Sequence, residues 1–109
     1  MQAVTMIIRG LPMLHIISTF PLSRSFLENT NSGDTVIFTD NAIFAVKQKN
    51  FETETLTQKA FSHINLCVRK ADLIIKNISN SELIRSVTII DEIQYKNVTS
   101  EDLAIKSYN

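Results

Sequence analysis

The chain has 109 residues, 44% of them hydrophobic, and its eleven basic and eleven acidic side chains cancel. This length suits one domain with a single core, and the balanced charge without long like-charged runs gives no reason to expect direct nucleic acid binding. One cysteine and two histidines, His15 and His63, exclude an internal disulfide and a Cys/His zinc cluster, and favour a reducing, cytoplasmic location.

The first twelve residues, Met1 to Pro12, are interpreted as an N-terminal extension before a single domain over residues 13–109. Their apolar patch is interrupted by Arg9 and is shorter than a membrane-spanning helix requires, so we expect no membrane anchor. The charge follows the apolar residues instead of preceding them, unlike the order in a signal peptide. The segment is interpreted as the product of an upstream translation start or as a remnant of recombinant expression.

The first predicted elements are a strand, a helix and a second strand. An apolar run over residues 14–17 predicts a buried strand. Proline fits the first turn of a helix because its missing N–H costs nothing there, so Pro21 predicts a helix start. The turn-forming residues 29–34 end this helix, and residues 36–38 form the next strand. The inward stripe of the helix is expected to be Leu22, Phe26 and Leu27.

Asp40 is the candidate N-cap of a short helix that extends to Val46. Residues 43–46 are apolar all round this helix, which predicts that they serve both the core and a subunit interface. The polar segment 47–58 follows, and we expect a loop with one helical turn there.

In the second half, Ile64, Leu66 and Val68 alternate with more polar residues and predict a third strand. A short helix is expected over residues 72–78, and a fourth strand over 87–90 with a helix after it. Strands alternating with short helices predict an α/β fold, a three-layer α/β/α sandwich with a mainly parallel sheet.

These segments, in this order and spacing, resemble the TusB/DsrH family. The residues that carry the resemblance are Met13-Leu14-His15, the Gly33-Asp34 turn with the strand and helix to Val46, the segment Ile64 to Asn77, and Val87 to Tyr108. The resemblance covers residues 13–108, with 47–63 matching poorly. Asn41 and Asn77 stand where the family usually has glycine, and asparagine tolerates the left-handed conformation better than most residues.

The resemblance implies a DsrE/F/H-like fold and a non-catalytic subunit of a TusBCD-like sulfurtransferase complex. In that family, three related subunits form a heterohexamer, a dimer of trimers with TusC-like and TusD-like partners. The complex receives persulfide sulfur from a small carrier protein and relays it for 2-thiolation of the wobble uridine in tRNA. A DsrH-like subunit in sulfur oxidation is an alternative, and a stand-alone homo-oligomer with a divergent role also stays open.

Cys67 is the only candidate nucleophile for persulfide chemistry. It lies near the carboxyl end of a strand, where open α/β sheets place their sites, and Arg69 and Lys70 follow it. The sequence around it resembles that of the acting cysteine in TusD-like subunits, but its spacing to the next helix end matches the TusB pattern, in which this position is not catalytic. We favour a structural Cys67, with an active sulfur carrier as the alternative.

Four residues are candidates for partner contacts: His15, Asp40, Phe44 and Tyr108. Tyr108 matches the terminal aromatic residue of the family, which anchors an interface or covers the core. His15 is interpreted as a hydrogen-bonded strand residue or a subunit contact. With only Gly10 and Gly33 there is no Gly-rich phosphate loop, so we expect no nucleotide, flavin or other cofactor.

Overall fold

The computed structural model describes residues 12–100 and 104–108, so the predictions for the first eleven residues lie outside the described part. Its elements alternate between strands and helices, as expected for an α/β chain. In chain order they are β1 (Met13–Ile17), α2 (Arg24–Asn29), β2 (Thr35–Phe38), the 3-10 helix η1 (Asp40–Val46), α3 (Thr53–Phe61), β3 (Asn65–Arg69), α4 (Lys70–Ile75), the 3-10 helix η2 (Asn80–Glu82), β4 (Val87–Ile90), α5 (Glu92–Ser100) and β5 (Ala104–Tyr108).

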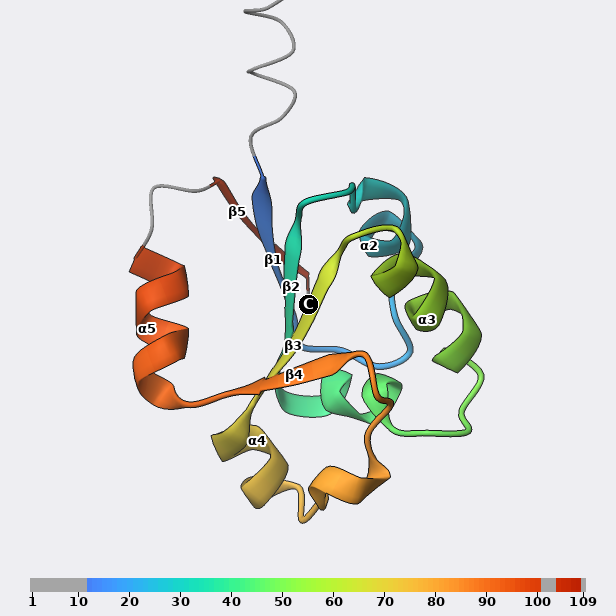
Figure 1. Ribbon diagram of the computed structural model, residues 1–109, viewed down its shortest axis with the longest axis vertical. Coiled ribbons are helices and arrows are strands. Elements are labelled where there is room, and N and C mark those ends of the chain that lie inside the picture. The colour runs from blue at the N-terminus through green and yellow to red at the C-terminus, as the bar shows by residue number, and fades with distance from the viewer. Residues whose placement is uncertain (1–11, 101–103, 109) are drawn as a thin grey trace, which may run out of the picture.

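The strands form a five-stranded sheet in the order β4-β3-β2-β1-β5. Every neighbouring pair in it is parallel. Helices cover both faces, with α2 and α3 on one side and α5 on the other, while α4 lies at the end of the sheet (Figure 1). The predicted α/β sandwich with a parallel sheet is therefore confirmed.

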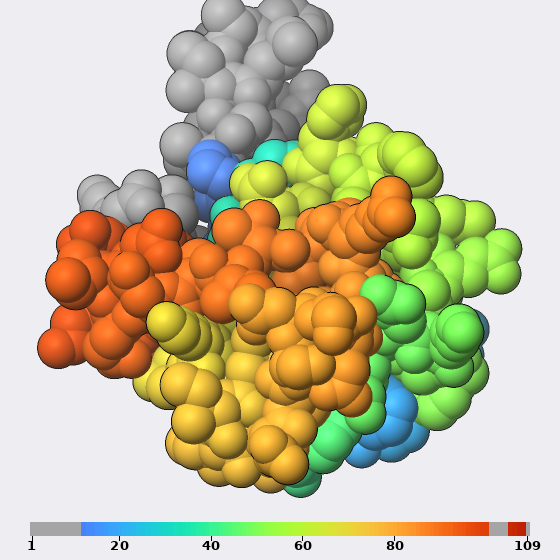
Figure 2. Space-filling view, turned by 60° about the horizontal axis from the view of Figure 1, so that its bottom comes forward, coloured from blue at the N-terminus to red at the C-terminus, as the bar shows by residue number. Residues whose placement is uncertain are grey.

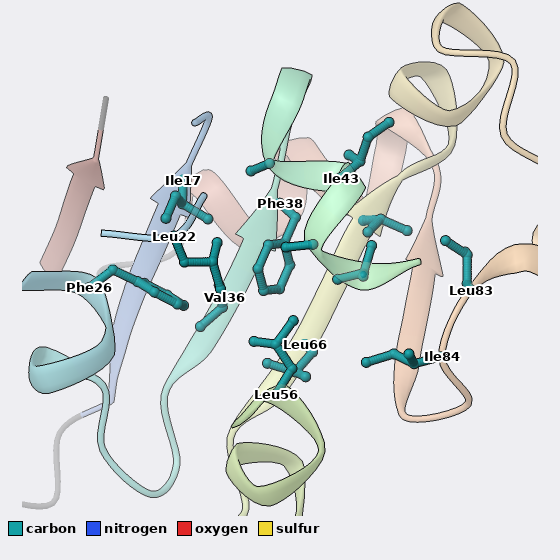
Figure 3. Packing of buried hydrophobic residues seen from close by; sticks show 14 of the residues in the cluster. Ile17, Leu22, Phe26, Val36, Phe38, Ile43, Leu56, Leu66, Leu83 and Ile84 are labelled. Carbon is teal, nitrogen blue, oxygen red and sulfur yellow. The ribbon is translucent and has the colours of Figure 1, made fainter. Parts of the chain in front are cut away.

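The main core lies between the sheet and the side that carries α2, α3 and η1 (Figure 3). Val36 and Phe38 of β2 project into it beside Phe26 of α2, Leu56 of α3 and Leu66 of β3, and all five are almost completely buried. Because side chains alternate along a strand, the intervening residues face the opposite side. A parallel sheet is buried on both faces, which explains the nearly continuous apolar runs of its strands.

The second face of the sheet has a smaller core under α5. Leu14, Ile37 and Ile90 are buried there, and the partly buried Tyr95 and Val98 of α5 pack against them. A single nine-residue helix covers this face within the described chain, and Ile105 of β5 remains half-exposed beside it. The two cores thus differ in size, because fewer buried residues form the one on the α5 side.

The first helix begins later than Pro21 predicted. It starts at Arg24, with Ser23 as its N-cap, because the Ser23 hydroxyl accepts a hydrogen bond from the backbone N–H of Phe26 at 3.0 Å. Leu22 is buried, as expected, but precedes the helix, and its backbone N–H donates to Glu52. The helix therefore takes its start from the serine cap and not from the proline.

The predicted loop after η1 is also wrong, because residues Thr53–Phe61 form α3. Only Leu56 of this helix is completely buried, so the segment has little of the apolar periodicity that identifies a helix from sequence. Asn50 supports the turn before the helix through its side-chain carbonyl, which accepts from the backbone N–H of Glu52 at 2.7 Å.

At the start of η1, Thr39 occupies the N-cap position that was predicted for Asp40. Asp40 lies in the first turn and has φ of 50°, whereas Asn41 is not among the described non-glycine residues with positive φ. The left-handed conformation expected at Asn41 thus falls one residue earlier. Aspartate, like asparagine, enters this region more readily than branched residues.

The helix after β3 spans Lys70–Ile75, two residues earlier at its start than predicted. Asn77 follows it with φ of 58°, so the left-handed cap expected at this asparagine is confirmed. A fifth strand, β5, was missed altogether, because residues 87–108 were expected to hold one strand and one helix. β5 pairs with β1, with Ile17 opposite Tyr108.

Candidate functional site

A buried polar network joins β1, the turn before β2, and β5. The Nε2 atom of His15 lies 2.8 Å from Oδ2 of Asp34, and its Nδ1 atom lies 2.9 Å from the Tyr108 hydroxyl. Because a carboxylate only accepts, Nε2–H is the donor to Asp34, and in the neutral imidazole Nδ1 accepts the Tyr108 O–H. His15 is completely buried and both of its ring nitrogens are satisfied.

Asp34 also holds the backbone around it. Its Oδ1 accepts from the backbone N–H of Met13 at 3.0 Å, and its Oδ2 accepts from that of Asn31 at 2.9 Å. Burial, followed by the charge of Asp34, raises the pKa of Tyr108, so the hydroxyl keeps its proton as a hydrogen-bond donor. The network is shielded from solvent and joins β1 to β5 and to the turn before β2. A structural role therefore accounts for it.

Cys67 lies in the smaller core on the α5 side of the sheet, between Ile37 of β2 and Thr88 of β4 in the strand register. Its side chain is partly buried, and burial raises the pKa of its thiol. A raised pKa reduces the fraction of thiolate, which is the nucleophilic form, at neutral pH. The environment therefore disfavours attack by this sulfur.

The cation that follows Cys67 in the sequence is engaged elsewhere. The Arg69 guanidinium lies 3.1 Å from Oε2 of Glu92, 3.8 Å from Oδ2 of Asp72, and 4.3 Å from the ring centre of Tyr95. Desolvation alone would lower the pKa of Arg69, but the Glu92 hydrogen bond and the nearby carboxylates raise it. The arginine thus ties β3, α4 and α5 together at the carboxyl end of the sheet.

Asp40 and Phe44 lie beside α4 at the same end of the sheet. The Nζ atom of Lys76 lies 3.2 Å from the Asp40 carboxylate, 2.9 Å from the Asn41 side-chain oxygen and 5.9 Å from the centre of the Phe44 ring. The Asp40 side chain is well exposed, while Phe44 is partly buried. Of the four residues predicted for partner contacts, these two are near the surface, whereas His15 and Tyr108 lie in the interior.

Large apolar side chains are also exposed on α4 and in the segment after η1. Ile74 and Ile75 of α4 are 69% and 75% exposed, and Phe51 is 70% exposed next to Phe20, with 5.4 Å between the ring centres. In Figure 2, α4, the segment around η2 and the η1 region adjoin one another across this end of the molecule. We call Asp40, Phe44, Phe51, Ile74 and Ile75 the carboxyl-end surface.

A groove lies along one side of the carboxyl-end surface, between α4 and η2. It is lined by Leu73, Ile74, Asn77, Ile78, Ser79 and Glu82. Its mixture of aliphatic side chains with a few polar groups differs from the charged and hydroxyl-rich lining of a phosphate site. Sequence reasoning missed the groove because η2 was not predicted, although the Ser79–Glu82 spacing is that of a capping box.

A second depression lies at the opposite, amino end of the sheet, and polar residues such as Thr30, Gln58 and Ser62 line it. Lys59 is part of this lining and donates from Nζ to the Leu27 carbonyl at 2.8 Å. Partial burial lowers the pKa of Lys59. The contact caps the end of α2, so a structural role accounts for this lysine.

The described residues contain no cluster of three or more His, Cys, Asp or Glu side chains with the geometry to hold a metal ion. In the same part of the chain, no helix is long and apolar enough to cross a bilayer. What the described side chains at the carboxyl end do offer is exposed apolar groups and one ion pair.

A model of the DsrH-like proteins matches residues 18–102. The chain belongs to the DsrH-like family. This membership makes it a protein of the sulfur-relay type, and the family works in complexes with DsrE/F-like partners. The matched range contains Asp34 and Cys67 but excludes His15 and Tyr108, so the buried network of this DsrH-like protein extends beyond the matched segment.

Solved structures support the fold of the DsrH-like protein. A protein of unknown function from Methanobacterium thermoautotrophicum has a TM-score of 0.76 at 11% identity, covering 91% of this chain and all of that one. The ychN protein from E. coli has a TM-score of 0.65 at 13% identity, covering 90% of this chain and all of that one. No functionally curated protein matches the sequence. At such identities the likeness concerns the fold alone.

Proposed function

We propose that this chain is the non-catalytic subunit of a TusBCD-like complex that relays persulfide sulfur in the cytoplasm for 2-thiolation of the wobble uridine in tRNA. Membership of the DsrH-like family supports the sulfur-relay class. The setting of Cys67 supports a non-catalytic role, because burial raises its pKa and the guanidinium of Arg69 is directed to carboxylates and to Tyr95. The acting cysteine would then belong to a TusD-like partner.

The observation that carries the proposal is the carboxyl-end surface. Ile74, Ile75 and Phe51 expose large apolar side chains on the end of the molecule that also carries the Asp40–Lys76 ion pair. Exposed apolar groups with a polar rim are typical of protein contacts. We propose that a DsrE/F-like subunit covers this surface, with Asp40 and Phe44 at its edge and with His15 and Tyr108 supporting the sheet behind it.

Matched isoleucine variants test this surface. The tagged chain is co-expressed with the DsrE-like and DsrF-like proteins of the same genome, and the recovered partners are quantified. Ile75→Glu should reduce recovery at least tenfold, since a charge would be buried in the contact. Ile93→Glu adds the same charge on α5, at a side chain that is 71% exposed, and should leave recovery unchanged. Equal recovery of the partners with both variants would refute the proposal that a partner covers the carboxyl-end surface.

The reaction is tested in cells that lack the gene, by mass spectrometry of the tRNA wobble uridine. We expect loss of 2-thiolation and restoration by both the wild-type chain and Cys67→Ser. Normal thiolation in the deletion strain, together with failure to grow on reduced sulfur, would instead assign the chain to sulfur oxidation. Assembly of the complex without restored thiolation for Cys67→Ser would make this cysteine an active sulfur carrier.

A further inference from the structure

β5 is an edge strand whose inward anchor is its final residue. Among its side chains from Ile105 onward, only that of Tyr108 is buried, while the other three are exposed. The strand pairs with β1 along its whole length, from Met13 opposite Ala104 to Ile17 opposite Tyr108. An edge strand with exposed side chains has little apolar burial to hold it, so its docking depends on the few groups that do reach the core.

Tyr108 contacts three residues outside β5 through its side chain and its backbone carbonyl. Its hydroxyl binds Nδ1 of His15 at 2.9 Å, and its ring stacks on the imidazole with 5.8 Å between the ring centres. The ring also meets Phe26 edge to face at 5.5 Å. Its backbone carbonyl accepts from the backbone N–H of Ser18 at 3.1 Å and from the Ser18 hydroxyl at 3.3 Å. The ring, the hydroxyl and the carbonyl thus each hold β5 in place.

We propose that β5 is a strap at the edge of the sheet that opens and closes as a unit, with Tyr108 as its latch and His15 as the residue to which the latch binds. When the strap is closed, β1 is an inner strand and both ring nitrogens of His15 have hydrogen-bond partners. When it opens, one side of the β1 backbone loses its partner and Nδ1 of His15 loses its donor. This device concerns the opposite edge of the sheet from β4 and goes beyond the proposed sulfur relay.

The latch also sets the register of the parallel pair. A shift of β5 by two residues keeps its faces but places Lys106 where Tyr108 stands. A lysine has no aromatic ring to pack on Phe26 and would bring its charge next to the buried imidazole. The complete network therefore specifies one alignment of β5 against β1, in the way that buried polar groups specify register in other folds.

Hydrogen exchange of the full-length chain, read at single-residue resolution by NMR, tests the strap. Tyr108→Phe keeps the ring but removes the hydroxyl, and should lower protection of the β5 amides about tenfold. Tyr108→Ala removes the ring as well, and should lower it more than about a hundredfold. In both variants the amides that join β2 to β3 should keep their wild-type protection, because the strap opens without the rest of the sheet.

Ser107→Ala is the matched control, since Ser107 is exposed on the other face of the same strand. It should leave β5 protection unchanged. Wild-type protection of β5 in Tyr108→Ala would refute the latch. A uniform loss in β5 and in the β2–β3 pair, seen in Tyr108→Phe as well as in Tyr108→Ala, would refute a strap that moves as a separate unit.

Discussion

The Tyr108 hydroxyl lies 2.9 Å from Nδ1 of His15, a contact between residues 93 positions apart in the chain. The other nitrogen of the same ring lies 2.8 Å from Asp34. One imidazole therefore links the first strand, the turn before the second and the last strand. This ring orients the three segments by directional hydrogen bonds in the buried interior.

Asp34→Ala is expected to destabilise the fold by about 3 kcal/mol, because it leaves one fully buried donor and two partly buried donors without their acceptor. These are Nε2–H of His15 and the backbone N–H groups of Met13 and Asn31. Urea unfolding followed by circular dichroism measures the change. Glu28→Ala is the control: its ion pair with Arg24 is exposed, and the expected change is under about 0.5 kcal/mol. Equal effects of both variants would contradict the structural role of Asp34.

Cys67 should react slowly with iodoacetamide in the folded protein at neutral pH. Burial raises the pKa of its thiol, so a smaller fraction is thiolate at a given pH than in a free cysteine. The alkylation rate is measured by intact mass from pH 6 to 10, about the range that spans the ordinary thiol pKa. Denatured protein should react at the rate of a free cysteine. Rapid labelling of the folded chain at pH 7, as for an activated thiol, would oppose the structural assignment.

Asn77 offers a test of backbone conformation. Its φ of 58° is unfavourable for most residues with a Cβ, less so for asparagine, and carries no such penalty for glycine. Asn77→Ala should therefore lower the free energy of unfolding by about 1 kcal/mol, whereas Asn77→Gly should change it little. Thermal unfolding of the two variants decides this, and a glycine variant less stable than the alanine variant would contradict it.

Glu82 should titrate at a lower pH than an ordinary glutamate. Hydrogen bonds from the backbone N–H and then the hydroxyl of Ser79 lower the pKa of its carboxyl. A lowered pKa means that the capping box stabilises the fold above the unfolded-state pKa, and that this contribution is lost as the pH falls through the folded-state value.

An NMR titration of the Glu82 side chain measures this directly. Glu82→Gln keeps an acceptor for the Ser79 N–H but carries no charge, so its stability should lack the contribution that the wild type loses in acid. A Glu82 midpoint at or above that of a glutamate in an unstructured peptide would contradict the prediction.

The parts of the fold that could be predicted from sequence are those with strong apolar patterns. Strands β1 to β4 have nearly continuous or alternating apolar residues, because a parallel sheet is buried on both faces. α3 escaped prediction because it offers the core little beyond Leu56, and its other residues have no inward stripe. β5 escaped because three of its side chains are exposed, so tertiary pairing and not local pattern makes it a strand.

The candidate site divides in the same way. Asp40 and Phe44 could be placed near the carboxyl ends of strands, because that position follows from the order of elements. The contacts among His15, Asp34 and Tyr108 could not be predicted. These residues are distant in sequence, and their proximity in space depends on strand order, which periodicity does not reveal. No role was predicted for Ile74 and Ile75 within the expected short helix, and only the structure reveals that α4 directs both toward solvent.

The adjacency of β1 and β5 has a consequence for biosynthesis. β1 is the first described strand to leave the ribosome and β5 the last, so β1 keeps an unpaired edge while all the intervening elements are made. Contacts between such distant segments also slow folding, because the loop between them must close first. A nascent chain of this protein is therefore most exposed to wrong strand pairing just before Tyr108 emerges, and that interval is where a chaperone would have the most to protect.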